Sequence, residues 1–127
     1  MSDYYPDRWI LLKTGDEFKI FGSWCGGYTT GDSWRMNSGI KSVSVDIQNR
    51  IDAEQDIWSD YFSPDDTLRG VYKVYGYSGS VYHCPFASYG ANIYAYGELL
   101  SLIDGTDTLQ LSESEALRYM KAMSENN

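Results

Sequence analysis

The chain has 127 residues, enough for one domain with one hydrophobic core, and its formal net charge is −8. This acidity disfavours direct contact with nucleic acids and anionic membranes, because both carry negative charge. Aromatic residues make up 16% of the chain, with twelve Tyr and four Trp, which excludes a disordered chain and is typical of a folded domain.

Two strands joined by a turn are expected near the N-terminus. Residues 8–13 and 17–21 are rich in large apolar side chains, and Thr14-Gly15-Asp16 between them has the composition of a tight turn. Apolar and charged side chains alternate over the second of these segments. We therefore expect an antiparallel hairpin with one buried face.

A loop rich in glycine and aromatic residues follows, over residues 22–35. Glycines let the backbone approach other groups closely, and large rings on such a loop suit recognition of a ligand or another protein. An alternative interpretation is a well-packed loop whose Trp rings cover the core. The candidate binding residues of this loop are Trp24, Tyr28, Trp34 and Arg35.

The middle of the chain contains both strand and helix patterns. Strict alternation predicts a strand over residues 42–47, and an apolar stripe that ends before Pro64 predicts a helix over residues 50–62. A second hairpin is expected from residues 71–77 and 80–84, because a Ser-Gly pair separates two runs of β-branched and aromatic side chains.

The predicted helix at 50–62 is strongly acidic. Six acids and no base occur between residues 52 and 66. On a helix, Asp52, Asp56 and Asp60 would lie on one face about 5–6 Å apart. Such a row can imitate the phosphates of a nucleic acid and fit a basic groove on a protein, although it is also typical of an ordinary solvated face.

Residues 92–103 are ambiguous. They can form a helix capped by Asn92, but Ile93, Tyr94 and Tyr96 also suit a strand, and both alternatives stay open. The helical alternative predicts that the four large aliphatic residues of its second half pack inward: Leu99, Leu100, Leu102 and Ile103.

The C-terminal segment begins with Ser112-Glu-Ser-Glu115, a capping box that predicts a helix. Together the patterns predict an α+β fold over residues 1–127 as a single domain. We expect an antiparallel sheet of about four to six strands, with two or three helices packed on one face, including the C-terminal helix.

The sequence contains two Cys and one His. Cys25 and His83 are the one pair that could supply a thiol nucleophile and its base, but they belong to different segments. His83 and Cys84 are neighbours on a predicted strand and should point to opposite faces. A structural zinc site needs four Cys or His ligands. We therefore expect no catalytic residues, no metal site and no cofactor.

The N-terminal segment is polar, and the longest apolar runs are far too short to span a bilayer. With two cysteines and no secretory signal, a reducing compartment is expected, which indicates the cytoplasm.

Three local phrases, at residues 21–28, 32–40 and 78–84, resemble small uncharacterised proteins of tailed phages and prophages. This resemblance carries no functional residues. It implies a small acidic accessory protein in the cytoplasm of a bacterial host, a class in which inhibitors of host defence systems are common.

The leading functional hypothesis is therefore a non-enzymatic binding protein. Its partner would be a protein with a basic surface, and the sharpest version is a phage-encoded inhibitor of a host defence or nucleic-acid-handling protein. The alternative is a small-molecule or sugar-binding module that uses the rings of the Gly-rich loop. A weak hydrolase or cysteine enzyme is the third class. A monomer and a homodimer both remain open, and no direct nucleic-acid or membrane partner is expected.

Overall fold

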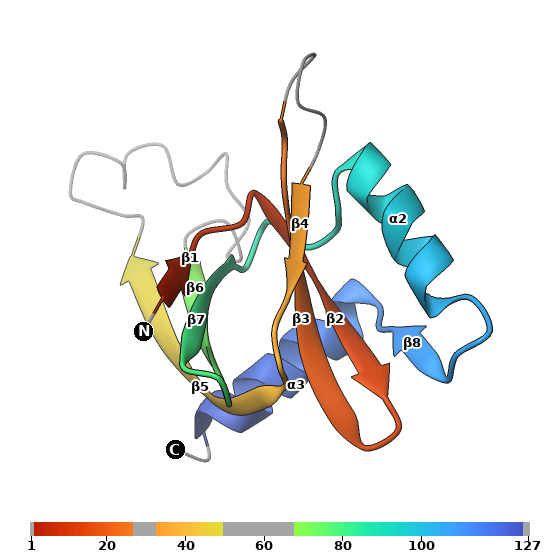
Figure 1. The fold of residues 1–127 in the computed structure, drawn as a ribbon. Coiled ribbons are helices and arrows are strands. Elements are labelled where there is room, and N and C mark those ends of the chain that lie inside the picture. The colour runs from red at the N-terminus through yellow and green to blue at the C-terminus, as the bar shows by residue number, and fades with distance from the viewer. Residues whose placement is uncertain (1, 27–32, 50–67, 126–127) are drawn as a thin grey trace.

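The computed structural model describes residues 2–26, 33–49 and 68–125, which form two four-stranded sheets and two helices (Figure 1). The first sheet has the order β1 (Ser2–Tyr4), β7 (Ser80–Pro85), β6 (Leu68–Gly76), β5 (Ile40–Asn49). The second has the order β4 (Ser33–Met36), β3 (Glu17–Trp24), β2 (Arg8–Thr14), β8 (Thr108–Gln110). The helices are α2 (Ile93–Ile103) and α3 (Glu113–Glu125).

The predicted α+β class is confirmed, as are both hairpins and the C-terminal helix. The described strands divide between two sheets, whereas one sheet was expected. The named strands pair antiparallel except where β1 joins β7 in parallel, and an isolated parallel bridge joins Trp9 and Tyr89. The predicted strand at 42–47 is part of β5, while the predicted helix at 50–62 lies outside the described residues.

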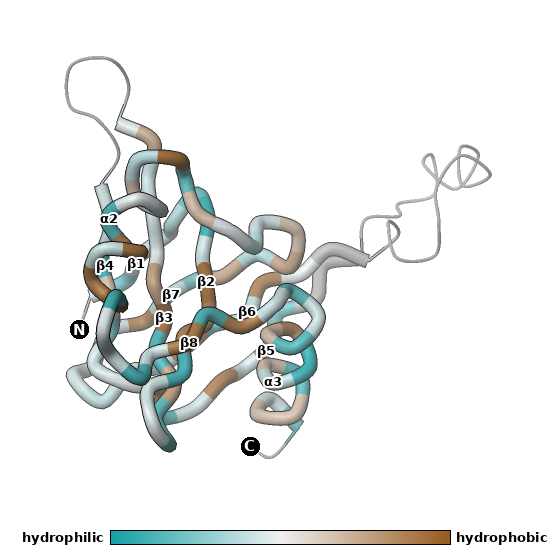
Figure 2. The backbone as a smooth tube through the Cα atoms, turned by 90° about the vertical axis from the view of Figure 1, so that its right-hand side faces the viewer, coloured by the Kyte–Doolittle hydropathy of each residue, from teal (hydrophilic) through white to brown (hydrophobic). Residues whose placement is uncertain are grey.

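The division into two sheets follows from β2, whose side chains are buried on both faces. Trp9 and Leu11 point into a core shared with the first sheet and α3. Ile10 and Leu12 point the other way, into a second core beneath α2. Figure 2 shows apolar stretches in the central strands β2 and β3. Because both faces of this hairpin are apolar, the two helices cover opposite faces of the second sheet and not one common face.

Of the two alternatives for residues 92–103, helix or strand, the structure has the helix, with Asn92 at the N-cap position. Leu99 is fully buried, as predicted. The inward packing expected for Leu100 and Leu102 is wrong, because these side chains are 46% and 47% exposed. Successive helical residues diverge by about 100°, so an inward Leu99 turns Leu100 away from the sheet. Leu102, three residues further on, lies at the edge of the buried stripe and lines a groove beside Trp34.

Candidate protein-binding surface

The outer side of α2 is a large apolar surface. Ile93 is 84% exposed and Tyr94 is 75% exposed, and Leu100 and Leu102 are each about half exposed. The helix carries a single charged side chain, Glu98. Figure 1 shows α2 at the periphery of the molecule, with its outer side turned away from both sheets. Ile93 and Leu100, seven residues apart, share one side of the helix, whereas Leu102 lies on the side toward Trp34. Several exposed large apolar side chains on one helix are typical of an interaction site.

The inner side of α2 explains why the helix sits there. Ala95 and Leu99 are one turn apart, and both are buried in the core cluster that contains Phe21. The backbone N–H of Asn92 donates a hydrogen bond to Ser23 Oγ over 3.2 Å, which fixes the start of the helix against β3. Packing of the inner stripe therefore determines which side chains face outward.

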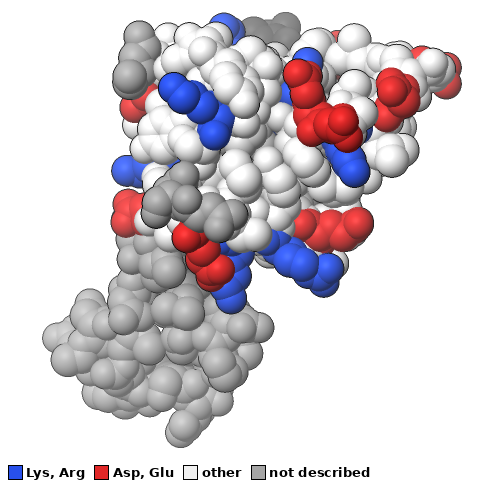
Figure 3. Space-filling view, turned by 90° about the horizontal axis from the view of Figure 1, so that it is seen from below, with Lys and Arg blue, Asp and Glu red and all other residues white. Residues whose placement is uncertain are grey.

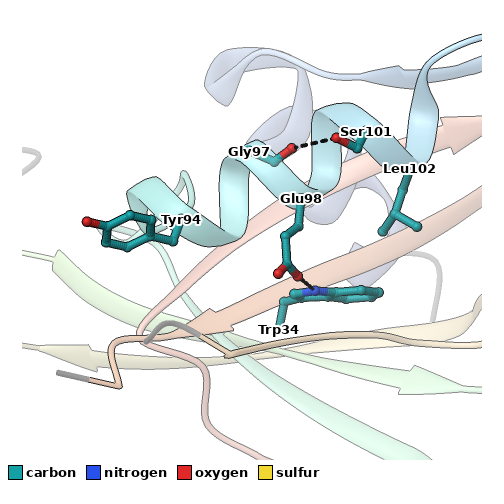
Figure 4. Close-up of a pocket in the computed structure, with 6 residues that line it drawn as sticks. All are labelled: Trp34, Tyr94, Gly97, Glu98, Ser101 and Leu102. Atoms are coloured by element: carbon teal, nitrogen blue, oxygen red, sulfur yellow. Dashed lines mark hydrogen bonds between the residues drawn. The ribbon is translucent and has the colours of Figure 1, made fainter. Parts of the chain in front are cut away.

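An open groove of about 590 Å³ runs between β4 and α2 (Figure 4). Trp34 Nε1 donates a hydrogen bond to Glu98 Oε2, and the Trp34 ring stacks on Phe21 at a centroid distance of 5.3 Å. Figure 4 shows Tyr94 pointing away from Trp34. The two aromatic rings that line this groove therefore do not face each other. Its lining residues are Trp34, Tyr94, Gly97, Glu98, Ser101 and Leu102.

The predicted residues of the Gly-rich loop do not form one site. In the β3–β4 pairing, Trp24 lies opposite Ser33, and Trp34 lies opposite Ser23. Because neighbouring strand residues point to opposite faces, Trp34 faces α2 while Trp24 and Arg35 face the other way. Tyr28 lies outside the described residues.

Trp24 and Arg35 instead hold the N-terminal strand. Trp24 Nε1 donates a hydrogen bond to the carbonyl oxygen of Tyr5 over 3.0 Å. The Arg35 guanidinium carbon lies 4.5 Å from the centroid of the Tyr4 ring, a cation–π contact. Burial raises the pKa of Tyr82, which packs on Tyr4, to about 12, although Arg35 opposes this rise. These contacts indicate a structural role for the two residues.

A second groove, of about 480 Å³, lies at the N-terminal end of α2. Arg8 lines it from β2, Cys25 from the residue directly after β3, and Ile93 from the helix. Asn92 makes no side-chain capping bond, and its Nδ2 is buried without a partner in the described part of the chain. This groove meets the first one at Tyr94, so both open beside the same helix.

The thiols and the imidazole belong to different sites. The exposed Cys25 donates its backbone N–H to Asp7 Oδ2 over 2.8 Å. The His83 ring stacks on Tyr5 at 4.1 Å, and its Nε2 lies 3.6 Å from Asp3 Oδ2. That separation suits an ion pair if His83 is charged but is too long for a hydrogen bond. Cys84 points into the core, where burial raises the pKa of its thiol.

The described part of the chain lacks a metal-binding cluster and a membrane-spanning helix. Within residues 2–26, 33–49 and 68–125, no group of three or more His, Cys, Asp or Glu side chains could hold a metal ion. No helix in this part of the chain is long and apolar enough to cross a membrane. Asp52, Asp56 and Asp60 lie outside the described residues.

Sequence reasoning missed the outer surface of α2, although a signal was present. Eleven residues with one charge, Glu98, give a helix that is apolar almost all round, and such a helix is normally buried on every side. The chain has no significant match among protein-family models, curated proteins or solved structures. The residues described above are therefore the basis for a proposal of function.

Proposed function

We propose that the protein is a non-enzymatic binding protein that acts by protein–protein contact, with the outer side of α2 as a contact surface. The observation that carries the proposal is the exposure of Ile93, Tyr94 and Leu100 on the outer side of a helix with one charged residue. Single exposed apolar residues are common, but a cluster of them is rare on a monomer. Aromatic and aliphatic side chains also supply the central contacts of most protein interfaces.

The ionisable groups support binding over bond-making chemistry. A cysteine enzyme needs a thiol within hydrogen-bond reach of a base. Cys84 is buried in the core, and its raised pKa keeps it protonated and unreactive. Cys25 lies in the groove beside Arg8, whereas His83 is engaged with Tyr5 and Asp3.

We assign the acidity of the chain to a second role, attraction of a partner with a basic surface. Figure 3 shows acidic and basic side chains interspersed on one face of the described part of the molecule, without a large field of one sign. Six of the 18 acids occur between residues 52 and 66. The phage-like phrases favour a host defence or nucleic-acid-handling protein as this partner, with inhibition by occupation of its basic groove.

The α2 contact is tested by Leu100→Glu, which places a charge in the exposed apolar surface without disturbing the core. Leu109→Glu is the matched control, because Leu109 is 62% exposed on β8. Tagged protein is used for affinity capture from a bacterial lysate, with quantitative mass spectrometry. We expect proteins retained by the wild type and the control to be lost with Leu100→Glu. Equal retention by all three would contradict the role of α2.

The electrostatic role is tested separately. Combined reversal of Asp52, Asp56 and Asp60 to Lys should weaken capture of a basic partner and flatten its dependence on salt, because long-range attraction is screened by ions. An affinity and a salt dependence equal to those of the wild type would reject the basic partner and leave the α2 contact untouched.

A further inference from the structure

We infer that the chain that docks on α2 is a second copy of this protein, in an antiparallel α2–α2 contact across a twofold axis near Gly97. The inference rests on the proposed role of α2 as a protein-contact surface and names its occupant. Three features carry it: the glycine itself, the self-complementary sizes of the side chains around it, and the charges at the two ends of the helix.

Gly97 lies in the middle of α2 and is exposed. A glycine destabilises a helix relative to alanine, so its presence calls for a reason. A Cβ built at Gly97 would meet no atom of the described chain within 4 Å. The packing of the described chain around α2 therefore does not require a glycine here. Close approach of another backbone from outside does require one.

The next turn of α2 also presents a small residue on the side of Gly97. Ser101 follows Gly97 on the same side of the helix, and its hydroxyl donates a hydrogen bond to the Gly97 carbonyl oxygen over 3.3 Å (Figure 4). The Ser101 hydroxyl thus has a hydrogen-bond partner within the helix. A second protein can cover it without burying an unpaired polar group. Small residues one turn apart let two helices approach closely.

The large side chains fit the same symmetry. In an antiparallel pair centred on Gly97, residues equally far before and after Gly97 face each other. Ile93 then packs over Ser101 of the second copy, and Tyr94 packs beside Leu100 of the second copy. The large Ile93 thus meets the small Ser101 at each end of the contact, and Tyr94 and Leu100 add an apolar contact beside each such pair.

The helix ends carry complementary charges. At the N-terminal end, the Arg8 guanidinium lies against Gly90, because a Cβ built on Gly90 would be 2.9 Å from Arg8 Nη1. At the C-terminal end stands Asp104, the C-cap residue. Arg8 lines the groove at the N-terminal end of α2 together with Ile93 and Tyr94, and Asp104 caps the C-terminal end. In an antiparallel pair the end of one helix that carries Asp104 lies beside the end of the other that carries Arg8.

Both charges are available for this contact. Among the described residues, no ion pair involves Arg8 or Asp104. The first turn of α2 has no acidic residue and the last turn has no basic one, so neither end of the helix dipole is compensated by the helix itself. An antiparallel second copy supplies the missing charge at both ends.

The available area favours a modest dimer. The exposed side chains of α2 offer on the order of several hundred Å², compared with ~800 Å² per partner in a standard stable interface. We therefore expect a monomer–dimer equilibrium that depends on protein concentration in the micromolar range or above.

The test is sedimentation velocity of the full chain over a range of concentrations. Arg8→Asp and Asp104→Arg should each weaken dimerisation about tenfold or more, because each places like charges together at both ends of the contact. A mixture of the two variants should form the dimer again, as should a chain that carries both substitutions. Asp16→Arg, in the turn between β2 and β3, controls for net charge.

Gly97→Ala gives an independent readout. It should raise the thermal stability of the monomer, because alanine favours the helix, and yet weaken the dimer. A monomer at every concentration, or a dimer that none of these variants affects, would overturn the inference. If the wild type is monomeric but Leu100→Glu still abolishes capture from the lysate, the proposed contact role of α2 stands and its occupant is another protein.

Discussion

Tyr89 links segments that are distant in the sequence. Its hydroxyl accepts a hydrogen bond from the backbone N–H of Leu11 over 3.1 Å and donates one to the carbonyl oxygen of Leu111 over 2.6 Å. Its ring contacts Trp9 edge-on at 4.8 Å. Burial, followed by the nearby acids Glu113 and Glu115, raises the pKa of Tyr89 to about 12, although its bond with Leu11 opposes the rise.

This raised pKa predicts alkaline sensitivity. The unfolded chain releases the Tyr89 proton near the ordinary value of 10.0, whereas the folded chain retains it up to about 12. The contribution of protonated Tyr89 to the free energy of unfolding is therefore fully present below pH 10 and is lost as the pH rises toward 12. Urea unfolding between pH 8 and 12 should show a falling free energy of unfolding.

Tyr89→Phe separates this effect from general alkaline denaturation. We expect a loss of about 1–3 kcal/mol at pH 8, because two backbone groups lose their partner. Between pH 10 and 12 the variant should lose less stability than the wild type, although Tyr82 still contributes to the slope since its pKa is also raised to about 12. Parallel pH profiles of variant and wild type would contradict the assignment.

At the scale of the element, α3 is fixed by the capping box that the sequence predicts. The backbone N–H of Glu115 donates to Ser112 Oγ over 3.2 Å, and the backbone N–H of Ser112 donates to Glu115 Oε1 over 3.1 Å. The bonds that the backbone N–H and the hydroxyl of Ser112 donate to Glu115 Oε1 lower the pKa of the Glu115 carboxyl. The first turn of α3 therefore begins at a defined residue, and Ala116 and Met120 are placed toward the core.

Ser112→Ala should lower the free energy of unfolding by about 1 kcal/mol, the usual cost of losing an N-cap side chain. The ionised Glu115 stabilises the folded state above its ordinary pKa of 4.5 and loses this effect as the pH falls, so the variant should also be less sensitive to acid. Denaturant unfolding at pH 7 and pH 4 measures both. Ser124→Ala, at the far end of α3, should leave the acid response unchanged.

At the scale of the whole molecule, the second sheet separates two cores. One lies between the sheets and against α3, and the other lies beneath α2. The α2 surface is therefore built on a sheet whose far face is fully packed. This arrangement lets α2 stay apolar on the outside, because the inner stripe of Ala95 and Leu99 is enough to hold it in place.

The packing of the first core is tested by Met120→Ala. Met120 has no exposed surface, and its truncation should cost about 2–5 kcal/mol through lost contacts and a residual cavity. Leu109→Ala, at an exposed position on β8, should change stability by less than about 0.5 kcal/mol. Comparable losses in chemical denaturation would show that the core is not where the described contacts place it.

The sequence by itself determined the local elements. Alternation between residues 17 and 20, turn residues at 14–16 and 78–79, and the Ser112–Glu115 box are local patterns, and each corresponds to a hairpin or helix in the structure. These signals can be read from the chain because turns and caps depend on neighbouring residues alone.

Only the tertiary structure decided which surfaces are exposed. Trp24 and Trp34 share a Gly-rich stretch, but the register of β3 with β4 turns them to opposite faces. Leu100 and Leu102 fit a buried helix by composition, and the contact of α2 with the sheet leaves them outside. The physical reason is that burial depends on the partner of each face. That partner is set by strand register and sheet packing between segments far apart in the chain.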